Sequence, residues 1–197
     1  MLFMSLMLML APTEYPAFDE ERAAALCEAK RAERDMTILY EDNASCVADQ
    51  RADHRYFTVI AANTDPALAP AFARCARTWT KDGTTDWGMM QYCARTNLDG
   101  KRDFAALRAE TKNLLRLSVD KCVAEETEDD SPDWGSIASC ARDQMGGHRD
   151  LALFRRTAPT ATERQGIDLC RMQAVDDEDK VVDWASAVRC AARIQIY

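Results

Sequence analysis

Glycine, proline and histidine are scarce in this chain, which contains 7, 6 and 2 of them among its 197 residues. An all-β protein needs glycine and proline for its many turns, so these low counts argue against that fold class. Alanine, leucine, arginine and glutamate are plentiful, and these residues favour helix. We therefore expect a helical protein.

Short motifs that carry common catalytic or nucleotide-binding sites are also absent. The sequence contains no GxSxG, HExxH, P-loop or GxGxxG. It contains no Cys-x2-Cys pair, so the closely spaced ligands of a zinc site are missing. We predict no catalytic, cofactor-binding or metal-binding residues and no cofactor. Carboxylate pairs remain an open alternative, because nearly any acidic sequence contains them.

Basic residues are the minority among the charged ones. The chain has 25 Lys and Arg against 33 Asp and Glu, a formal net charge of -8. A protein that binds nucleic acid needs a basic face to replace counterions, so we expect no nucleic-acid partner.

An uncharged apolar run covers residues 2–10. It is shorter than the roughly 20 residues that a membrane-spanning helix needs, and its length matches the core of a secretory signal peptide. We expect residues 1–11 to be a signal peptide that directs export to a periplasm or the extracellular space, and the mature chain not to insert stably into a membrane. The positively charged n-region is missing, as it would be if the start codon were placed too late. An apolar N-terminal strap on the domain is the alternative.

What the chain does have is eight cysteines at regular intervals. Four of them are 48, 47 and 48 residues apart, and the other four are 47, 47 and 50 apart. An aromatic residue stands six positions before each cysteine of the second set, as Tyr40 in the first copy and within an Asp-Trp pair in the others. A regular period across the chain predicts a repeat architecture. The two sets are Cys27, Cys75, Cys122 and Cys170, and then Cys46, Cys93, Cys140 and Cys190.

Each repeat is typical of an antiparallel helical hairpin. We expect first helices over residues 18–35, 66–81, 104–126 and 160–175, each followed by a short polar loop and a second helix. The Asp of the Asp-Trp pair can cap that second helix, and the Trp begins its buried stripe. The two cysteines lie at equal distances from the loop, which places them opposite each other as a disulfide requires. This register selects the pairs Cys27–Cys46, Cys75–Cys93, Cys122–Cys140 and Cys170–Cys190.

The predicted fold is therefore all-α, a tandem array of four disulfide-stapled antiparallel helical hairpins with a period of about 48 residues. We expect a single repeat domain over residues 12–197, with repeats at about 18–53, 54–100, 101–147 and 148–197. An open curve and a closed globule are both compatible with this pattern. The plan is similar in architecture to the disulfide-stapled helical hairpins of secreted Sel1-like proteins. The period here is longer, and their Gly/Ala/Tyr signature is absent.

Positions just after the second cysteine recur as well. The seventh is Asp53, Gly100 or Gly147, which we expect to end the helix as a C-cap. The eighth is His54, Lys101 or His148. A position that accepts both His and Lys suits a cation or donor near a helix end, so we interpret both histidines as structural rather than as general bases or ligands. The acidic loops at 128–130 and 176–179 lack the spacing of an EF-hand and are interpreted as solvated turns rather than calcium sites.

The leading functional hypothesis is a secreted or periplasmic non-enzymatic protein that binds a protein or peptide, or acts as a scaffold, through stacked hairpins. Trp79 has no aromatic counterpart in the other repeats, which makes it the candidate for a binding surface. An aromatic residue packed between helices is the alternative for Trp79. The alternative function is a secreted enzyme or enzyme inhibitor with a site in a groove between repeats, near Trp79, Asp53 or residues 155–160.

Overall fold

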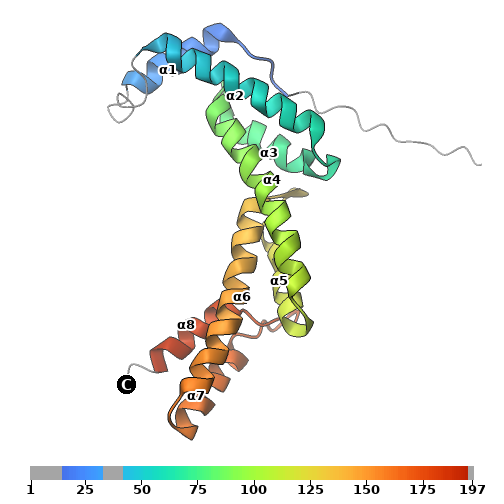
Figure 1. Ribbon diagram of the computed structural model, residues 1–197, viewed down its shortest axis with the longest axis vertical. Helices are drawn as coiled ribbons and strands as arrows, with labels where there is room; N and C mark the ends of the chain where they lie inside the picture. Colours follow the sequence, from blue (N-terminus) through green and yellow to red (C-terminus); the bar gives the residue numbers. More distant parts are fainter. Residues whose placement is uncertain (1–14, 33–41, 195–197) are drawn as a thin grey trace, which may run out of the picture. The chain divides into compact units, whose positions relative to one another are not determined.

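The computed structural model describes residues 15–32 and 42–194 (Figure 1). The expected signal peptide, Tyr40 and Tyr197 lie outside these residues. The described chain is helical apart from two short strand pairs and one isolated bridge, which confirms the all-α prediction. The molecule divides into two compact units, an N-terminal unit of residues 1–92 and a C-terminal unit of residues 93–197. Each unit is described by itself.

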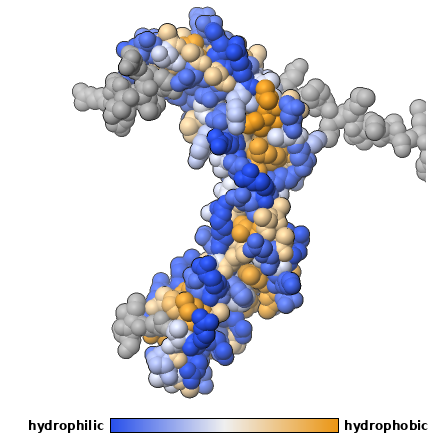
Figure 2. Space-filling view, viewed as in Figure 1, coloured by the Kyte–Doolittle hydropathy of each residue, from blue (hydrophilic) through white to orange (hydrophobic). Residues whose placement is uncertain are grey.

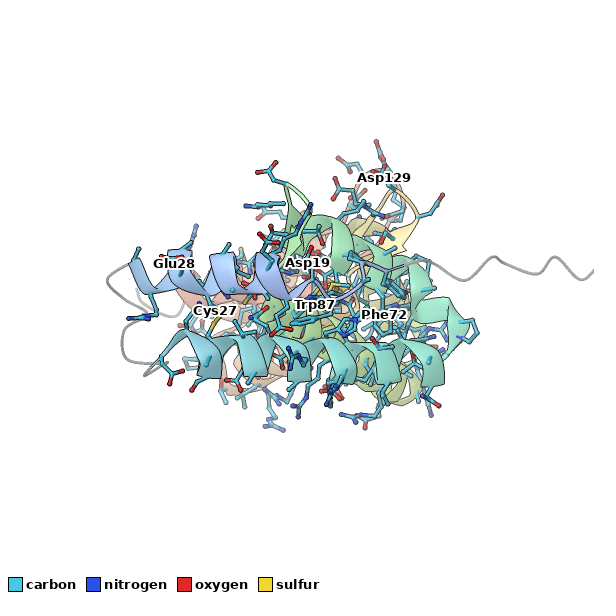
Figure 3. The ribbon with its side chains drawn as sticks, turned by 90° about the horizontal axis from the view of Figure 1, so that it is seen from above. Asp19, Cys27, Glu28, Phe72, Trp87 and Asp129 are labelled. Atoms are coloured by element: carbon cyan, nitrogen blue, oxygen red, sulfur yellow. A yellow bond between two sulfur atoms is a disulfide. The ribbon has the colours of Figure 1, made fainter. Side chains whose placement is uncertain are left out.

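The N-terminal unit is built on a helical hairpin of α1 (Glu20–Ala32) and α2 (Asn43–Asn63). The Cys27–Cys46 disulfide joins the two helices, with the Cα atoms 5.9 Å apart. After α2 come the 3₁₀ helix η1 (Pro66–Leu68), α3 (Ala69–Trp79), the strands β1 (Thr80–Lys81) and β2 (Thr84–Thr85), and the start of α4 (Trp87–Glu110). Phe72 of α3 and Trp87 of α4, both labelled in Figure 3, pack against Phe57 of α2, with ring centroids 6.0 Å away in each case.

The C-terminal unit contains two further hairpins. One pairs α5 (Asn113–Glu125) with α6 (Trp134–Thr157), and the other pairs α7 (Ala161–Gln173) with α8 (Trp184–Ile194). Disulfides Cys122–Cys140 and Cys170–Cys190 staple them, with Cα separations of 5.8 and 5.6 Å. Cys75 and Cys93 are also disulfide-bonded, so all eight cysteines are in bonds, as predicted.

Two of the polar loops are tight β-hairpins, which the sequence analysis did not foresee. Strands β1 and β2 pair Thr80 with Thr85, and Asp82 and Gly83 between them have φ values of 51° and 75°. Strands β3 (Thr127–Glu128) and β4 (Ser131–Pro132) enclose Asp129 and Asp130, whose φ values are 47° and 58°. Two-residue hairpin turns of type I′ require positive φ at both central residues, and Asp-Gly is a preferred sequence for them. The Asp82-Gly83 pair was therefore a usable signal.

The expected C-caps are wrong. Helices α2, α4 and α6 continue through Asp53, Gly100 and Gly147 for ten or more residues. A Cβ at Gly100 would lie 2.2 Å from the carbonyl oxygen of Trp134, and one at Gly147 would lie 2.4 Å from that of Trp184. Glycine stands at these positions because the backbone at the start of a later helix passes directly against it.

The helix expected over residues 104–126 is in fact two helices. Helix α4 ends at Glu110 and α5 begins at Asn113, whose φ is 52°. The Arg116 guanidinium holds this break, because its Nη2 donates to the Thr111 carbonyl at 2.8 Å. The start of the helix expected at residue 160 is confirmed. Thr160 caps α7, since its hydroxyl accepts from the Glu163 N–H at 3.1 Å and the Glu163 carboxylate accepts from the Thr160 N–H at 2.9 Å.

The apolar stripes behind the Asp-Trp pairs form the core. Each capping Asp accepts a backbone N–H from three residues on, at 3.1 Å for Asp133 and Ser136 and at 3.1 Å for Asp183 and Ser186. This confirms the predicted starts of the second helices at Trp134 and Trp184. Apolar surface, orange in Figure 2, is exposed on both units. The buried members of the stripes are Trp87, Met90, Ala94, Ile137, Ala138, Ala141, Trp184, Ala187 and Ala191.

Candidate functional site: a cavity in the N-terminal unit

Each Asp-Trp helix start receives an amide side chain from an earlier helix. The amide always stands four residues after the second cysteine of the preceding repeat. Its oxygen accepts the tryptophan backbone N–H, one of the donors that a helix start leaves without an intrahelical partner. This position was not among the predicted sites, although the recurrence of Gln, Asn and Gln is visible in the sequence. The pairs are Gln50 with Trp87 at 2.8 Å, Asn97 with Trp134 at 2.9 Å, and Gln144 with Trp184 at 2.8 Å.

The eighth position after the second cysteine packs against the same tryptophan. The ring of His54 lies 4.5 Å from that of Trp87 and the ring of His148 lies 4.6 Å from that of Trp184, both nearly perpendicular. Lys101 Nζ lies 5.7 Å from the Trp134 ring. His and Lys therefore share this position because each can pack a polarised N–H or C–H edge or an ammonium group on an indole. The helix end that we expected there is absent.

The three contacts between an amide-bearing helix and the next tryptophan are called junctions below. Each junction borders a cavity, and the eighth, twelfth and fifteenth positions after the second cysteine line all three. The cavity volumes are about 500 Å³ in the N-terminal unit, and about 280 and 290 Å³ at the two junctions of the C-terminal unit. One structural position therefore recurs three times, with one enlarged copy.

The enlarged copy, called the N-terminal cavity, is walled mainly by apolar and aromatic side chains. Its volume lies within the range of about 300–1,000 Å³ that is typical of small-molecule sites. The segment ahead of α1 supplies Tyr15 and Phe18, helix α2 supplies His54 and Ala61, and α3 supplies Phe72. Disulfide Cys27–Cys46 holds α1 against α2.

His54 lines this cavity and also packs against Trp87 at the first junction. Its ring lies between those of Phe18, at 5.6 Å, and Trp87, at 4.5 Å. Burial lowers the pKa of His54 below its usual value of 6.5, and the charge of the neighbouring Arg55 lowers it further. The imidazole is therefore uncharged at neutral pH.

Each of the two smaller cavities is lined by an arginine that forms an ion pair with an aspartate, and the larger cavity has no arginine in its lining. Arg108 Nε lies 2.5 Å from Asp120 Oδ1, and Arg155 Nε lies 2.9 Å from Asp168 Oδ1. The arginines stand fifteen residues after a second cysteine, and the aspartates two residues before the next first cysteine. In the N-terminal unit the same two positions hold alanine. These are Ala61 and Ala73.

A second polar cluster belongs to the turn between α7 and α8. Lys121 Nζ lies 2.7 Å from Asp176 Oδ2 and 2.9 Å from Asp179 Oδ2. The hydrogen bond from Lys121 and the backbone N–H groups of Glu178 and Asp179 lower the pKa of Asp176 to about 2. These bonds fix the turn to α5. Within the described residues, no group of three or more His, Cys, Asp or Glu side chains is placed to hold a metal ion.

Asp53 lies at the first junction. Its Oδ2 would be 3.4 Å from a Cβ built on Gly88. Burial raises the pKa of Asp53, and the charges of Asp49 and Asp86 raise it further, while Lys30 opposes them. Lys30 Nζ is paired with Asp86 at 2.6 Å. Asp53 therefore belongs to a half-buried charged cluster beside the cavity rather than to its wall.

Trp79 is the last residue of α3 and is half-buried. Its carbonyl accepts from the Asp86 N–H at 2.9 Å, which closes the β1–β2 hairpin. It does not line the N-terminal cavity. Residues 155–160 belong to the C-terminal unit, where Arg155 pairs with Asp168 and Thr160 caps α7. The three places that sequence analysis singled out thus fall in both units, and Trp79 as a binding residue stays a prediction.

Comparisons with protein-family models, with curated proteins and with solved structures give no match to this chain. Among the residues that the structure describes, no helix has the length and apolar character needed to cross a membrane. Disulfides form and persist in oxidising compartments, and four of them are typical of a protein that resides there.

Proposed function

We propose that the protein is a non-enzymatic binding protein that is exported to an oxidising compartment, and that the N-terminal cavity receives apolar side chains of a protein or peptide partner. The single observation that carries this proposal is the cavity of about 500 Å³ with aromatic side chains in its wall. Pockets that anchor a binding partner are usually filled by a few large side chains at the centre of the interface.

Two further features support it. The eight bonded cysteines are those of a protein in an oxidising environment. The disulfide holds α1 against α2, and the segment directly ahead of α1 lines the cavity with Tyr15 and Phe18. Walls that are held in place before a partner arrives lower the entropic cost of binding. The alternative of an enzyme or enzyme inhibitor stays a prediction.

The test is a selection of peptides from a random displayed library on the immobilised, oxidised protein. We expect enriched peptides with aromatic or aliphatic residues and saturable binding by calorimetry, with a negative heat-capacity change. Ala62 lines the cavity, and Ala62→Trp should weaken binding by about tenfold or more because the indole fills the space.

The matched control is Ala52→Trp, which adds the same side chain at an exposed position of α2 outside the cavity lining. Binding should be unchanged in this variant. A selection that yields no saturable peptide, or peptides that bind Ala62→Trp as tightly as the natural protein, would refute the proposal.

A further inference from the structure

Both junctions of the C-terminal unit have an Arg–Asp ion pair at two positions that are alanine in the N-terminal unit. In the second and third cavities an Arg from the long helix reaches an Asp on the following helix, twelve and thirteen residues later. Ala61 and Ala73 stand twelve residues apart in the corresponding positions of the N-terminal unit. The spacing of the two positions is therefore kept, while alanine methyl groups replace the two charged side chains.

We infer that the loss of this Arg–Asp pair opens the N-terminal cavity for an uncharged apolar group, and that the pair closes the other two cavities. The inference rests on the proposed function and adds to it the chemical class of the bound group.

Size supports the first half of the inference. Arg108 lines the second cavity and Arg155 lines the third, while Ala61 lines the first. The volumes are about 280 and 290 Å³ where an arginine is present and about 500 Å³ where alanine replaces it. The methylene groups of an arginine cover apolar surface while a carboxylate holds its guanidinium group. The pair therefore covers the apolar lining of the cavity with a polar group.

The charges around the cavity support the second half. Its lining includes no Lys or Arg among the described residues. Asp65 stands at an exposed position, where its carboxylate caps η1 by accepting from the Ala67 N–H at 2.9 Å. Arg51 lies 5.6 Å from the Phe18 ring, and its Nη2 is paired with Glu20 at 2.5 Å. A buried anionic group would therefore lack a cationic partner in the lining, and burying a charge without an opposite charge is costly.

The first experiment measures binding of the neutral fluorescent probe N-phenyl-1-naphthylamine to the oxidised full chain. The natural protein should bind about one probe, and Ala61→Arg combined with Ala73→Asp should weaken that binding by about tenfold or more, because the installed pair covers the apolar lining. The control is Val59→Arg, which adds the same charge to α2 at a position that is 62% exposed. This control should bind the probe as the natural protein does.

The reciprocal experiment opens a closed cavity. Arg108→Ala combined with Asp120→Ala removes an exposed ion pair, whose loss has little effect on stability. The variant should gain a second probe site, so that the stoichiometry rises from about one to about two per chain. This arm stays informative even if Ala61→Arg/Ala73→Asp fails to fold.

The charge class is tested by competition between 1-decanol and decanoate, which share the alkyl chain and differ in charge. Decanol should displace the probe at a concentration at least about tenfold lower than decanoate does. Equal competition would overturn the assignment of an uncharged group. If the natural protein and Ala61→Arg/Ala73→Asp bind the probe equally, and Arg108→Ala/Asp120→Ala gains no new site, the role of the pair is overturned. The proposed function would still stand. A natural protein that binds neither probe nor selected peptides would overturn both.

Discussion

The Gln144 side-chain oxygen accepts the backbone N–H of Trp184 at 2.8 Å, across a sequence separation of 40 residues. The same amide-to-tryptophan bond recurs from Gln50 and from Asn97, each across 37 residues. A local motif, the capped helix start, thus depends on a side chain from the preceding repeat. The junctions link repeats through hydrogen bonds, while the disulfides link the two helices within a hairpin.

Replacing Gln144 by Leu should lower the free energy of unfolding by about 1–3 kcal/mol, because the Trp184 N–H loses its acceptor in a half-buried place. Urea unfolding followed by circular dichroism measures the change. Gln173→Leu is the control, since it removes the same side chain from an exposed position of α7, and it should stay within about 0.5 kcal/mol of the natural protein. Equal stability of the two variants would contradict the role of the amide.

Adjacent glycines should respond in opposite ways to alanine. A Cβ at Gly147 would lie 2.4 Å from the carbonyl oxygen of Trp184, so Gly147→Ala should destabilise the protein by about 1–3 kcal/mol as the helices are forced apart. A Cβ at Gly146 meets nothing within 4 Å, so Gly146→Ala should stabilise α6 by about 0.5–1 kcal/mol. Thermal or urea unfolding of both variants measures these changes. A stabilising Gly147→Ala would show that the Trp184 carbonyl does not lie this close to Gly147.

The ion pair at the last turn should be visible in a titration. The pKa of Asp176 is lowered to about 2 from 3.8, chiefly by the hydrogen bond from Lys121. The stability that this carboxylate contributes is present above the unfolded pKa and is lost as the pH falls through the folded value. Carbon NMR of the Asp176 carboxyl group should show a midpoint near pH 2. Lys121→Met should raise that midpoint, whereas Lys180→Met, which removes a lysine that binds the Asp177 carbonyl, should not.

Acid should weaken the N-terminal unit through His54. Its pKa is lowered in the folded protein by burial and then by Arg55, so the unfolded chain binds a proton more readily. The free energy of unfolding should therefore rise with pH between the lowered pKa and about 6.5. Below the lowered pKa both states bind the proton, and the stability that the uncharged imidazole contributes is lost. Urea unfolding at several pH values from about 5 to about 8 should show this slope in the natural protein and a smaller slope in His54→Asn. The same slope in both proteins would contradict the shift.

Much of the fold could be predicted from cysteine spacing alone. Two cysteines at equal distances from a polar loop must face each other if both arms are helical, so the pairs Cys27–Cys46, Cys122–Cys140 and Cys170–Cys190 followed from counting residues. The capping roles of Asp133 and Asp183 followed from their place before a periodic apolar stripe, because capping is local chemistry.

The glycines show why counting was insufficient elsewhere. A glycine that ends a helix and a glycine that admits a neighbouring backbone give the same letter at the same spacing. Gly100 and Gly147 belong to the second kind because a tryptophan carbonyl lies against each of them, and that carbonyl comes from more than 30 residues further along the chain. No local pattern contains this contact.

The candidate site was largely hidden for the same reason. Trp79 was the predicted binding residue, because it adds an aromatic ring that the other repeats lack. The cavity instead depends on side chains that are absent, since Ala61 and Ala73 replace an Arg–Asp pair. That pair is recognisable only when Arg108 and Asp120 are seen in contact.

The sequence by itself determined the period, the helical class, the disulfide register and the helix starts, because each depends on spacing within a single hairpin. Only the tertiary structure decided which amide meets which tryptophan, why glycine recurs, and which junction borders the enlarged cavity. Those features depend on contacts between hairpins, where the partner of a side chain is set by packing across 30 to 40 residues rather than by its neighbours in the chain.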